Sequence, residues 1–159
     1  MLKQDSNIVI LRCSNGYGSP VMESKECWNL VLNEICLKAS KNETIMIKNP
    51  YAQRNFIPIS ESCRAVEFFL NTDLKLNEAY NVGSKETFTL EEIIELIRRR
   101  AYKTFSKNLN IIYPVYLEKE NENENFIYST KKLTDLGFNF KYNHKKELDK
   151  LLHFCNKIL

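Results

Sequence analysis

The sequence predicts an α/β fold, on three observations. Short runs rich in β-branched residues alternate with longer stretches whose apolar residues recur at helical spacing. The first run, N-I-V-I-L-R-C at residues 7–13, shows no polar alternation, which is typical of a parallel strand covered by helices on both faces. The 159 residues, 43% hydrophobic and 27% charged, have the size and composition of one globular domain.

The first third of the chain is predicted to hold a strand, a loop and a helix. The strand at 7–13 is followed by N-G-Y-G-S-P at 15–20, whose turn-forming residues predict a loop. Residues 24–41 then show the periodicity of a helix. Its expected apolar face carries Cys27, Leu30, Val31, Ile35 and Ala39.

Two short strands, a helix and a third strand are predicted next. The strands at 44–48 and 55–59 flank a loop at 49–54, which suggests a hairpin. Ser60 is expected to cap the following helix through its side-chain oxygen. The apolar stripe of that helix is expected to comprise Cys63, Val66, Phe69 and Leu70. A strand at 78–82 then ends at Gly83.

The clearest local signal marks the next helix. Thr89 and Glu92 have the spacing of a capping box, and Phe88 and Ile93 that of a hydrophobic staple, so a helix is expected from Thr89 to about residue 105. A strand at 109–113 follows. Residues 117–125 are expected to form a mobile acidic surface loop, because 118–125 contain no apolar side chain.

Two helices are predicted to complete the chain. A short helix starting at Ser129 or Thr130 is expected to end at Gly137, and the last helix is expected to be capped by Asn143. The apolar side of the last helix is formed by Leu148, Leu151, Leu152, Cys155 and Ile158.

Charge and hydropathy exclude two classes of partner. A net charge of +3 from 23 basic and 20 acidic residues is too small and too mixed for a nucleic-acid-binding protein. The basic run Arg98-Arg99-Arg100 is interpreted as a solvated helix face. No apolar stretch approaches the ~18 residues that a transmembrane helix needs, and the polar residues 1–6 do not resemble a signal peptide.

The cysteines and histidines indicate neither disulfides nor a metal site. The five cysteines are odd in number and include no C-x-x-C pair, so they are interpreted as reduced thiols in or near the core of a cytoplasmic protein. His144 and His153 have no cysteine partners at ligand spacing.

Four segments, in order, carry a family resemblance. Residues 11–20 resemble R-x-x-N-x-Y-G-x-P, and residues 53–66 resemble R-D-F-[IV]-x-V-x-D-x-x-x-A. Residues 79–84 resemble Y-N-[IV]-G-S before a capped helix, and 129–138 resemble S-x-K-x-x-x-L-G-[WF]. These are motifs of the extended short-chain dehydrogenase/reductase family, the NAD-dependent nucleotide-sugar epimerases and dehydratases. The resemblance implies that residues 1–159 form a single incomplete domain, with the C-terminal strands of a Rossmann-type sheet plus the small α/β substrate-binding lobe.

The resemblance also implies a set of binding residues. Asn15 would bond to the diphosphate or sugar, and Arg54 would hold a phosphate oxygen, for which a guanidinium is well suited. Cys13 and Ser14 would lie beside the nicotinamide ring of the cofactor. Asn29, Leu30 and Met46 would contact the nucleotide base. The alternatives are that Asn15 satisfies a tight turn, that Arg54 is an exposed loop charge and that Met46 belongs to the core.

Other parts of the family pattern are missing or altered. No G-x-x-G-x-x-G turn can be built from the four glycines, so the implied NAD(P) is not expected to bind this chain alone. Tyr128/Lys132 and Tyr142/Lys146 have the catalytic Tyr-x-x-x-Lys spacing but fall in segments matched to non-catalytic parts, so no catalytic residue is assigned. Asn55 stands where the family has aspartate, and the acidic loop replaces a region that often supplies a second arginine.

Two functions remain open. The chain is expected to be the substrate-binding half of a nucleotide-sugar epimerase or dehydratase, not competent alone, whose partner is a complementary N-terminal chain or a second copy. Alternatively it is a non-catalytic nucleotide-sugar binding or regulatory module, or a truncated product without independent function. The apolar run at 8–11 favours association, because an unpaired central strand exposes a hydrophobic edge.

Overall fold

The computed structural model describes residues 8–22, 25–72, 77–106, 108–113 and 126–159. The predicted acidic loop at 117–125 lies outside them. Four α-helices, α1, α2, α3 and α5, have eleven or more residues, and α4 is short. Their bounds are Val31–Lys41 (α1), Ile59–Leu70 (α2), Leu90–Phe105 (α3), Lys131–Asp135 (α4) and His144–Lys157 (α5); a 3₁₀ helix, η1, spans Lys25–Asn29.

The strands form three small sheets in which parallel pairing dominates. Strand β1 pairs with β5, β2 with β4 and β3 with β7, all in parallel, and β6 joins β4 antiparallel. The bounds are Val9–Cys13 (β1), Asn15–Tyr17 (β2), Ile45–Met46 (β3), Gln53–Pro58 (β4), Glu78–Val82 (β5), Thr87–Thr89 (β6) and Ile111–Ile112 (β7). Parallel strands alternating with helices confirm the α/β prediction.

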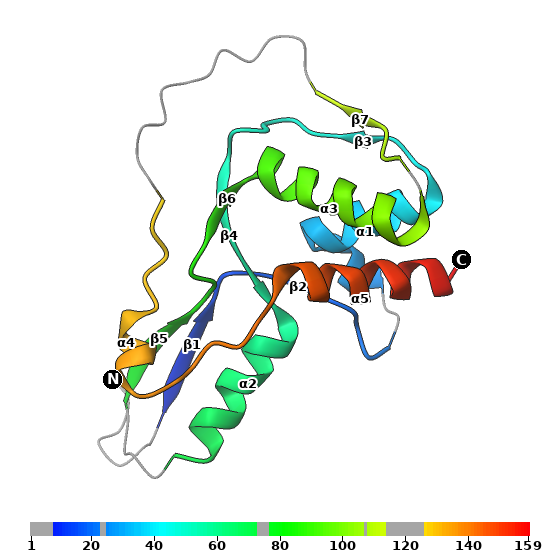
Figure 1. The fold of residues 1–159 in the computed structure, drawn as a ribbon. Coiled ribbons are helices and arrows are strands. Elements are labelled where there is room, and N and C mark those ends of the chain that lie inside the picture. Colours follow the sequence, from blue (N-terminus) through cyan, green and yellow to red (C-terminus); the bar gives the residue numbers. More distant parts are fainter. Residues whose placement is uncertain (1–7, 23–24, 73–76, 107, 114–125) are drawn as a thin grey trace.

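Two apolar cores lie on either side of the central strands. In one, α1, α3 and α5 pack side by side over Tyr17 and Phe56, as the upper part of Figure 1 shows. In the other, α2 and α4 pack on β1 and β5 around Ile57, Tyr80 and Leu133. Strands β2 and β4 therefore run between the two cores.

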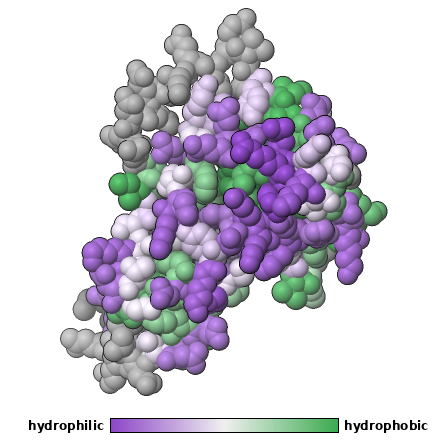
Figure 2. All heavy atoms as spheres, viewed as in Figure 1, coloured by the Kyte–Doolittle hydropathy of each residue, from purple (hydrophilic) through white to green (hydrophobic). Residues whose placement is uncertain are grey.

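Several local predictions are confirmed. Thr89 Oγ1 accepts a hydrogen bond from the Glu92 N–H, and the Glu92 carboxylate accepts one from the Thr89 N–H. The two bonds complete the capping box of α3. Asn143 caps α5, and Gly137 follows α4 with a φ of 97°. Arg98 and Arg99 pair with Glu95 at the surface. Arg100, the third residue of the predicted solvated run, departs from the prediction: its side chain is 18% exposed and pairs with Asp149 on α5. Figure 2 shows hydrophilic side chains over the outward faces of α3 and α5, as a solvated face requires.

The predicted hairpin and part of the predicted loop at 15–20 are wrong. Residues 44–48 and 55–59 do not form a hairpin: β3 pairs with β7, while β4 pairs with β2 and β6. Residues 15–17 are the strand β2 and not a loop. Parallel pairing joins segments distant in sequence, and residue spacing carries no information about such partners.

Two helix predictions are also corrected. The predicted helix at 24–41 is divided by Leu30, which has extended backbone angles between η1 and α1. Helix α2 begins at Ile59 after Pro58, so Ser60 lies inside the first turn instead of capping it. Proline suits this boundary because its φ is preset and it has no N–H to satisfy.

The predicted buried faces of β1 and α2 are wrong in part, although Phe69 of the predicted α2 stripe does pack in the second core. Val9 and Leu11 pack in the second core, but Ile10 is 51% exposed, so β1 is not covered on both faces. In α2 the buried residues are Glu61 and Ala65, and Val66 on the predicted stripe is exposed. Leu70 and Cys63 are exposed too, as is Cys13 at the end of β1. Cys36 and Cys155 are buried free thiols, as expected.

Candidate functional site

An open groove of about 310 Å³ lies between α1 and the strands β3 and β4. Its apolar wall consists of Val31, Ile35, Ile45, Ile47, Ala52 and Leu90, and its other lining residues are Glu34, Lys38, Met46, Lys48, Asn49 and Arg54. Glu34 and Lys38 form an ion pair of 2.6 Å along α1. Lys48 and Arg54 leave the polar side of the groove with an excess of positive charge.

Arg54 and Met46 are the two predicted site residues that the fold brings together in this groove. Arg54 lies on β4 instead of a loop, and its guanidinium donates a bond of 2.7 Å to the Gln53 carbonyl. Among the described residues no carboxylate forms an ion pair with it. Met46 is 69% exposed on β3, so the alternative that it belongs to the core is wrong.

The peptide groups of β3 point alternately to the two edges of the strand. The N–H groups of Ile45 and Ile47 donate to Asn110 and Ile112 in and beside β7, at 2.9 and 3.0 Å. In a parallel strand alternate residues point their peptide groups to opposite edges, so the N–H and C=O of Met46 point away from β7. The edge of β3 opposite β7 therefore carries the peptide donor and acceptor of Met46, a residue that lines the groove.

Asn15 lies on β2, not in a turn. Its side-chain amide donates a bond of 3.0 Å to the Asn55 carbonyl. It stands opposite Phe56, two residues from Arg54, so the register places Asn15 and Arg54 on one face of the β2–β4 pair. Asn15 does not line the groove.

Cys13 and Ser14 occupy the junction between β1 and β2. The Ser14 N–H donates to the Val82 carbonyl at 2.9 Å. The Ser14 hydroxyl is buried and has no hydrogen-bond partner among the described residues. Burying an unpaired hydroxyl costs free energy, so a hydrogen-bond partner for this atom would stabilise the fold.

Asn29 and Leu30, the other predicted base contacts, adjoin the groove without lining it. Asn29 is the exposed last residue of η1, and Leu30 accepts the first backbone bond of α1 from Glu34. Sequence reasoning missed Lys38 and Lys48, which line the groove. Lys38 could have been found, because it follows Val31 by seven residues and so lies on the same helix face.

The two Tyr-x-x-x-Lys matches do not form facing pairs. The Tyr128 hydroxyl donates to the Arg12 carbonyl at 2.6 Å, whereas Lys132 pairs with Glu78. Tyr142 bonds to Glu86 and precedes α5. No group of three or more potential metal ligands occurs in the described part of the chain, and no described helix has the length and apolar character to cross a membrane.

Comparison with known proteins shows similarity in structure alone. No protein-family model matches the sequence, and no curated protein matches it. RMD from Pseudomonas aeruginosa, solved with NADPH, superposes with a TM-score of 0.75 at 17% identity over 96% of this chain and 50% of its own. UDP-glucuronic acid 4-epimerase from Bacillus cereus, solved with UDP-glucuronic acid and NAD, superposes with a TM-score of 0.73 at 18% identity. The match covers 96% of this chain and 46% of the epimerase.

A dehydratase has the same fold. dTDP-glucose 4,6-dehydratase from Bacillus anthracis, solved with NAD, gives a TM-score of 0.70 at 18% identity over 94% of this chain and 44% of its own. The chain thus spans about half the length of the solved structures that it matches. The resemblance to NAD-dependent epimerases and dehydratases is confirmed at the level of fold, including the partial Rossmann-type architecture.

Proposed function

Because this chain has the fold of about half of a nucleotide-sugar epimerase or dehydratase, we propose that it is the substrate-binding part of such an enzyme. Residues 1–159 form one incomplete domain in this proposal. They bind the nucleotide part of the substrate and are not catalytically competent alone. The cofactor NAD(P) and the catalytic Tyr-Lys pair come from a further polypeptide segment.

The observation that carries the proposal is the groove containing Arg54 and Met46. Apolar side chains of α1 and β3 form a wall on which a flat base can pack, and the Met46 peptide edge can bond to the polar edge of the base. Arg54 lies at the same groove with its charge unpaired by described residues. A guanidinium binds phosphate oxygens through two parallel hydrogen bonds, which suits a nucleoside diphosphate.

The cofactor does not fit the described residues alone. A dinucleotide site needs a glycine-rich turn leading from a strand into a helix N-terminus, and the four glycines of this chain do not form one. Cys13 and Ser14 remain as residues that would adjoin the nicotinamide once a partner segment is docked. The buried Ser14 hydroxyl supports this placement, because it has no hydrogen-bond partner among the described residues.

The surface around β1 supports association with a partner. Among the described residues β1 pairs on one edge only, with β5, and Ile10 is exposed on it. Helix α2, which packs against β1, exposes Val66 and Leu70. An unpaired strand beside exposed apolar side chains is a template for another strand. The partner is a complementary N-terminal segment or, without it, a second copy of the chain.

The binding proposal is tested by titration calorimetry of the purified chain with UDP-glucose, UDP and NAD. We expect UDP-glucose and UDP to bind and NAD not to bind. The variant Arg54→Gln should weaken UDP binding by about tenfold or more, because a charge-assisted hydrogen bond contributes about 1.5–3 kcal/mol. The matched control Arg99→Gln changes an arginine on α3 that is 72% exposed and outside the groove.

Two results would contradict the proposal. If the unaltered chain binds neither UDP-glucose nor UDP, the groove is not a nucleotide site. If NAD binds stoichiometrically, the chain builds a cofactor site without the glycine-rich turn, and the division of labour proposed above is wrong.

A further inference from the structure

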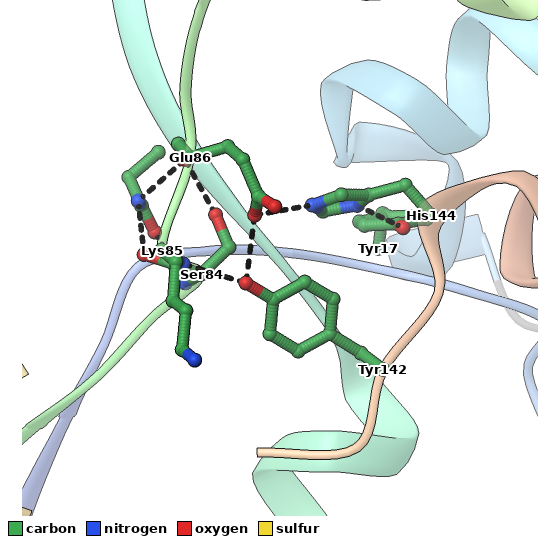
Figure 3. Close-up of polar contacts among 7 residues, drawn as sticks. Tyr17, Ser84, Lys85, Glu86, Tyr142 and His144 are labelled. Atoms are coloured by element: carbon green, nitrogen blue, oxygen red, sulfur yellow. Dashed lines mark hydrogen bonds and ion pairs between the residues drawn. The ribbon is translucent and has the colours of Figure 1, made fainter. Parts of the chain in front are cut away.

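A chain of four polar side chains joins segments far apart in the sequence (Figure 3). The Tyr17 hydroxyl lies 2.7 Å from Nδ1 of His144. On the other side of the ring, Nε2 lies 3.8 Å from the Glu86 carboxylate, which accepts the Tyr142 hydroxyl at 2.7 Å. We call Tyr17, His144, Glu86 and Tyr142 the His144 cluster.

The proton positions in the cluster follow from burial. Tyr17 is fully buried, and burial raises its pKa far above the ordinary value, so it keeps its proton. A neutral phenol can donate to an unprotonated Nδ1 or accept from a protonated one, so the hydrogen bond itself does not decide the tautomer. We infer that Tyr17 donates, because this tautomer places the ring N–H on Nε2, on the side of the Glu86 carboxylate. At 3.8 Å the separation is too long for a hydrogen bond, so the two groups interact through charge alone. Burial lowers the pKa of His144, against the opposing attraction of Glu86, so the neutral ring is the favoured form.

His144 contacts the strand neighbours of Asn15 and Arg54, the residues predicted to bind the diphosphate or sugar and a phosphate oxygen. Tyr17 follows Asn15 by two residues on β2, so the two share a face of that strand. Phe88 stands directly opposite Arg54 in the β4–β6 pair. The Phe88 ring meets the His144 ring edge-on, with centroids 5.3 Å apart and planes at 88°. One imidazole thus supports β2 by a hydrogen bond and β6 by ring packing.

We propose that neutral His144 is a positioning residue for the nucleotide-sugar groove, holding β2 and β6 so that Asn15 and Arg54 keep their relative position, and that protonation of the ring weakens this hold. The consequence for ligand affinity rests on the proposed function, whereas the coupling between His144 and the two strands does not. A protonated ring cannot accept the Tyr17 O–H. That hydroxyl is then a buried donor without its acceptor, which costs about 1–3 kcal/mol.

Other titratable groups surround the cluster. Those facing Tyr17 and His144 from the packed elements are Cys36 on α1, Glu86 before β6, Glu92, Glu95 and Arg99 on α3, Tyr142 before α5, and Lys145 and Glu147 on α5. Of these carboxylates Glu86 is the one at ion-pair distance from the ring, and it favours the protonated form. Its side chain is half exposed, so solvent screens this attraction.

The coupling is tested by a pH titration of the full chain followed by nuclear magnetic resonance. We expect the His144 ring to titrate with a midpoint below its ordinary value of 6.5, and the backbone amides of Asn15 and Arg54 to shift with the same midpoint. In Tyr17→Phe, which keeps the ring and removes the hydroxyl, the Asn15 amide should no longer follow His144, while the Arg54 amide still does. The matched control His153→Gln removes the exposed second histidine and should leave both responses unchanged.

A second arm measures UDP-glucose affinity at two pH values, one on either side of the His144 midpoint found by nuclear magnetic resonance. The affinity should fall about three- to tenfold at the lower pH in the unaltered chain and in His153→Gln, and His144→Gln should remove most of this pH dependence. Absence of UDP-glucose binding by the unaltered chain would refute the proposed function but not the coupling. Amides of Asn15 and Arg54 that do not follow the His144 midpoint would refute the positioning role, whatever the binding result.

Discussion

At the scale of single residues, Asn55 explains a departure from the family pattern. Its side chain is buried, and the amide nitrogen donates to the carbonyls of Ser84 and Glu86, both at 2.9 Å. Its Oδ1 accepts the Ser84 N–H, also at 2.9 Å. An aspartate could make the last bond but neither of the first two. The amide therefore fastens β4, and with it Arg54, to the turn before β6.

Asn55→Asp is expected to destabilise the protein by about 2–4 kcal/mol, because two buried carbonyls would lose a donor and face a carboxylate. Urea unfolding followed by circular dichroism measures the change. Asn71→Asp is the control, since Asn71 is exposed at the C-terminal end of α2 and its amide donates to the Glu67 carbonyl; it should cost about 1 kcal/mol or less. Equal stability of the two variants would show that Asn55 is not a structural clamp.

At the scale of elements, the start of α3 is the best-defined boundary in the chain. Its capping box satisfies two backbone donors reciprocally, and the helix carries Ile93, Ile94 and Ile97 into the first core. Leu90, its first residue, also lines the groove. The cap therefore fixes one end of the groove as well as one end of a helix.

Thr89→Ala should destabilise the protein by about 1 kcal/mol, the usual effect of losing an N-cap oxygen. Thr104→Ala makes the same change inside the last turn of α3 and should be nearly neutral. Thermal unfolding of the two variants side by side measures the difference. If Thr104→Ala costs as much as Thr89→Ala, the capping box adds nothing measurable.

At the scale of the whole molecule, exposed apolar side chains occur on β1, a strand that pairs on one edge among the described residues, and on the neighbouring helix α2. Figure 1 shows β1 and β5 side by side, with α2 next to them. Val66 and Leu70 are 47% and 80% exposed on α2, and Ile10 is exposed on β1. The matched structures are about twice as long as this chain.

The purified chain is expected to self-associate through this surface. Replacing Val66 and Leu70 together by lysine should shift the sedimentation profile toward monomer, because charge on an exposed apolar face opposes association. The control Tyr102→Lys alters an exposed aromatic residue on α3, away from β1, and should leave the profile unchanged. A monomeric unaltered chain with no apolar dye binding would contradict the expectation.

The sequence by itself determined the α/β class, most of the elements and their local boundaries. The capping box, the Asn143 cap and Gly137 are signals within a few residues of the structures they specify, so no partner is needed to interpret them. The family resemblance added Arg54 and Met46, which both line one groove.

Tertiary structure alone decided which strands pair, which face of α2 is buried and which groups meet at the groove. The pairing of β3 with β7 and the contact of Tyr17 with His144, 127 residues away, depend on how the elements dock. Helix periodicity shows that α2 is amphipathic, yet the buried residues are Ala65 and the charged Glu61. Glu61 can be buried because Arg64 and the Lys141 N–H both donate hydrogen bonds to its carboxylate. Such contacts between distant segments leave no local pattern, which is why the sequence did not reveal Lys48 or the His144 cluster.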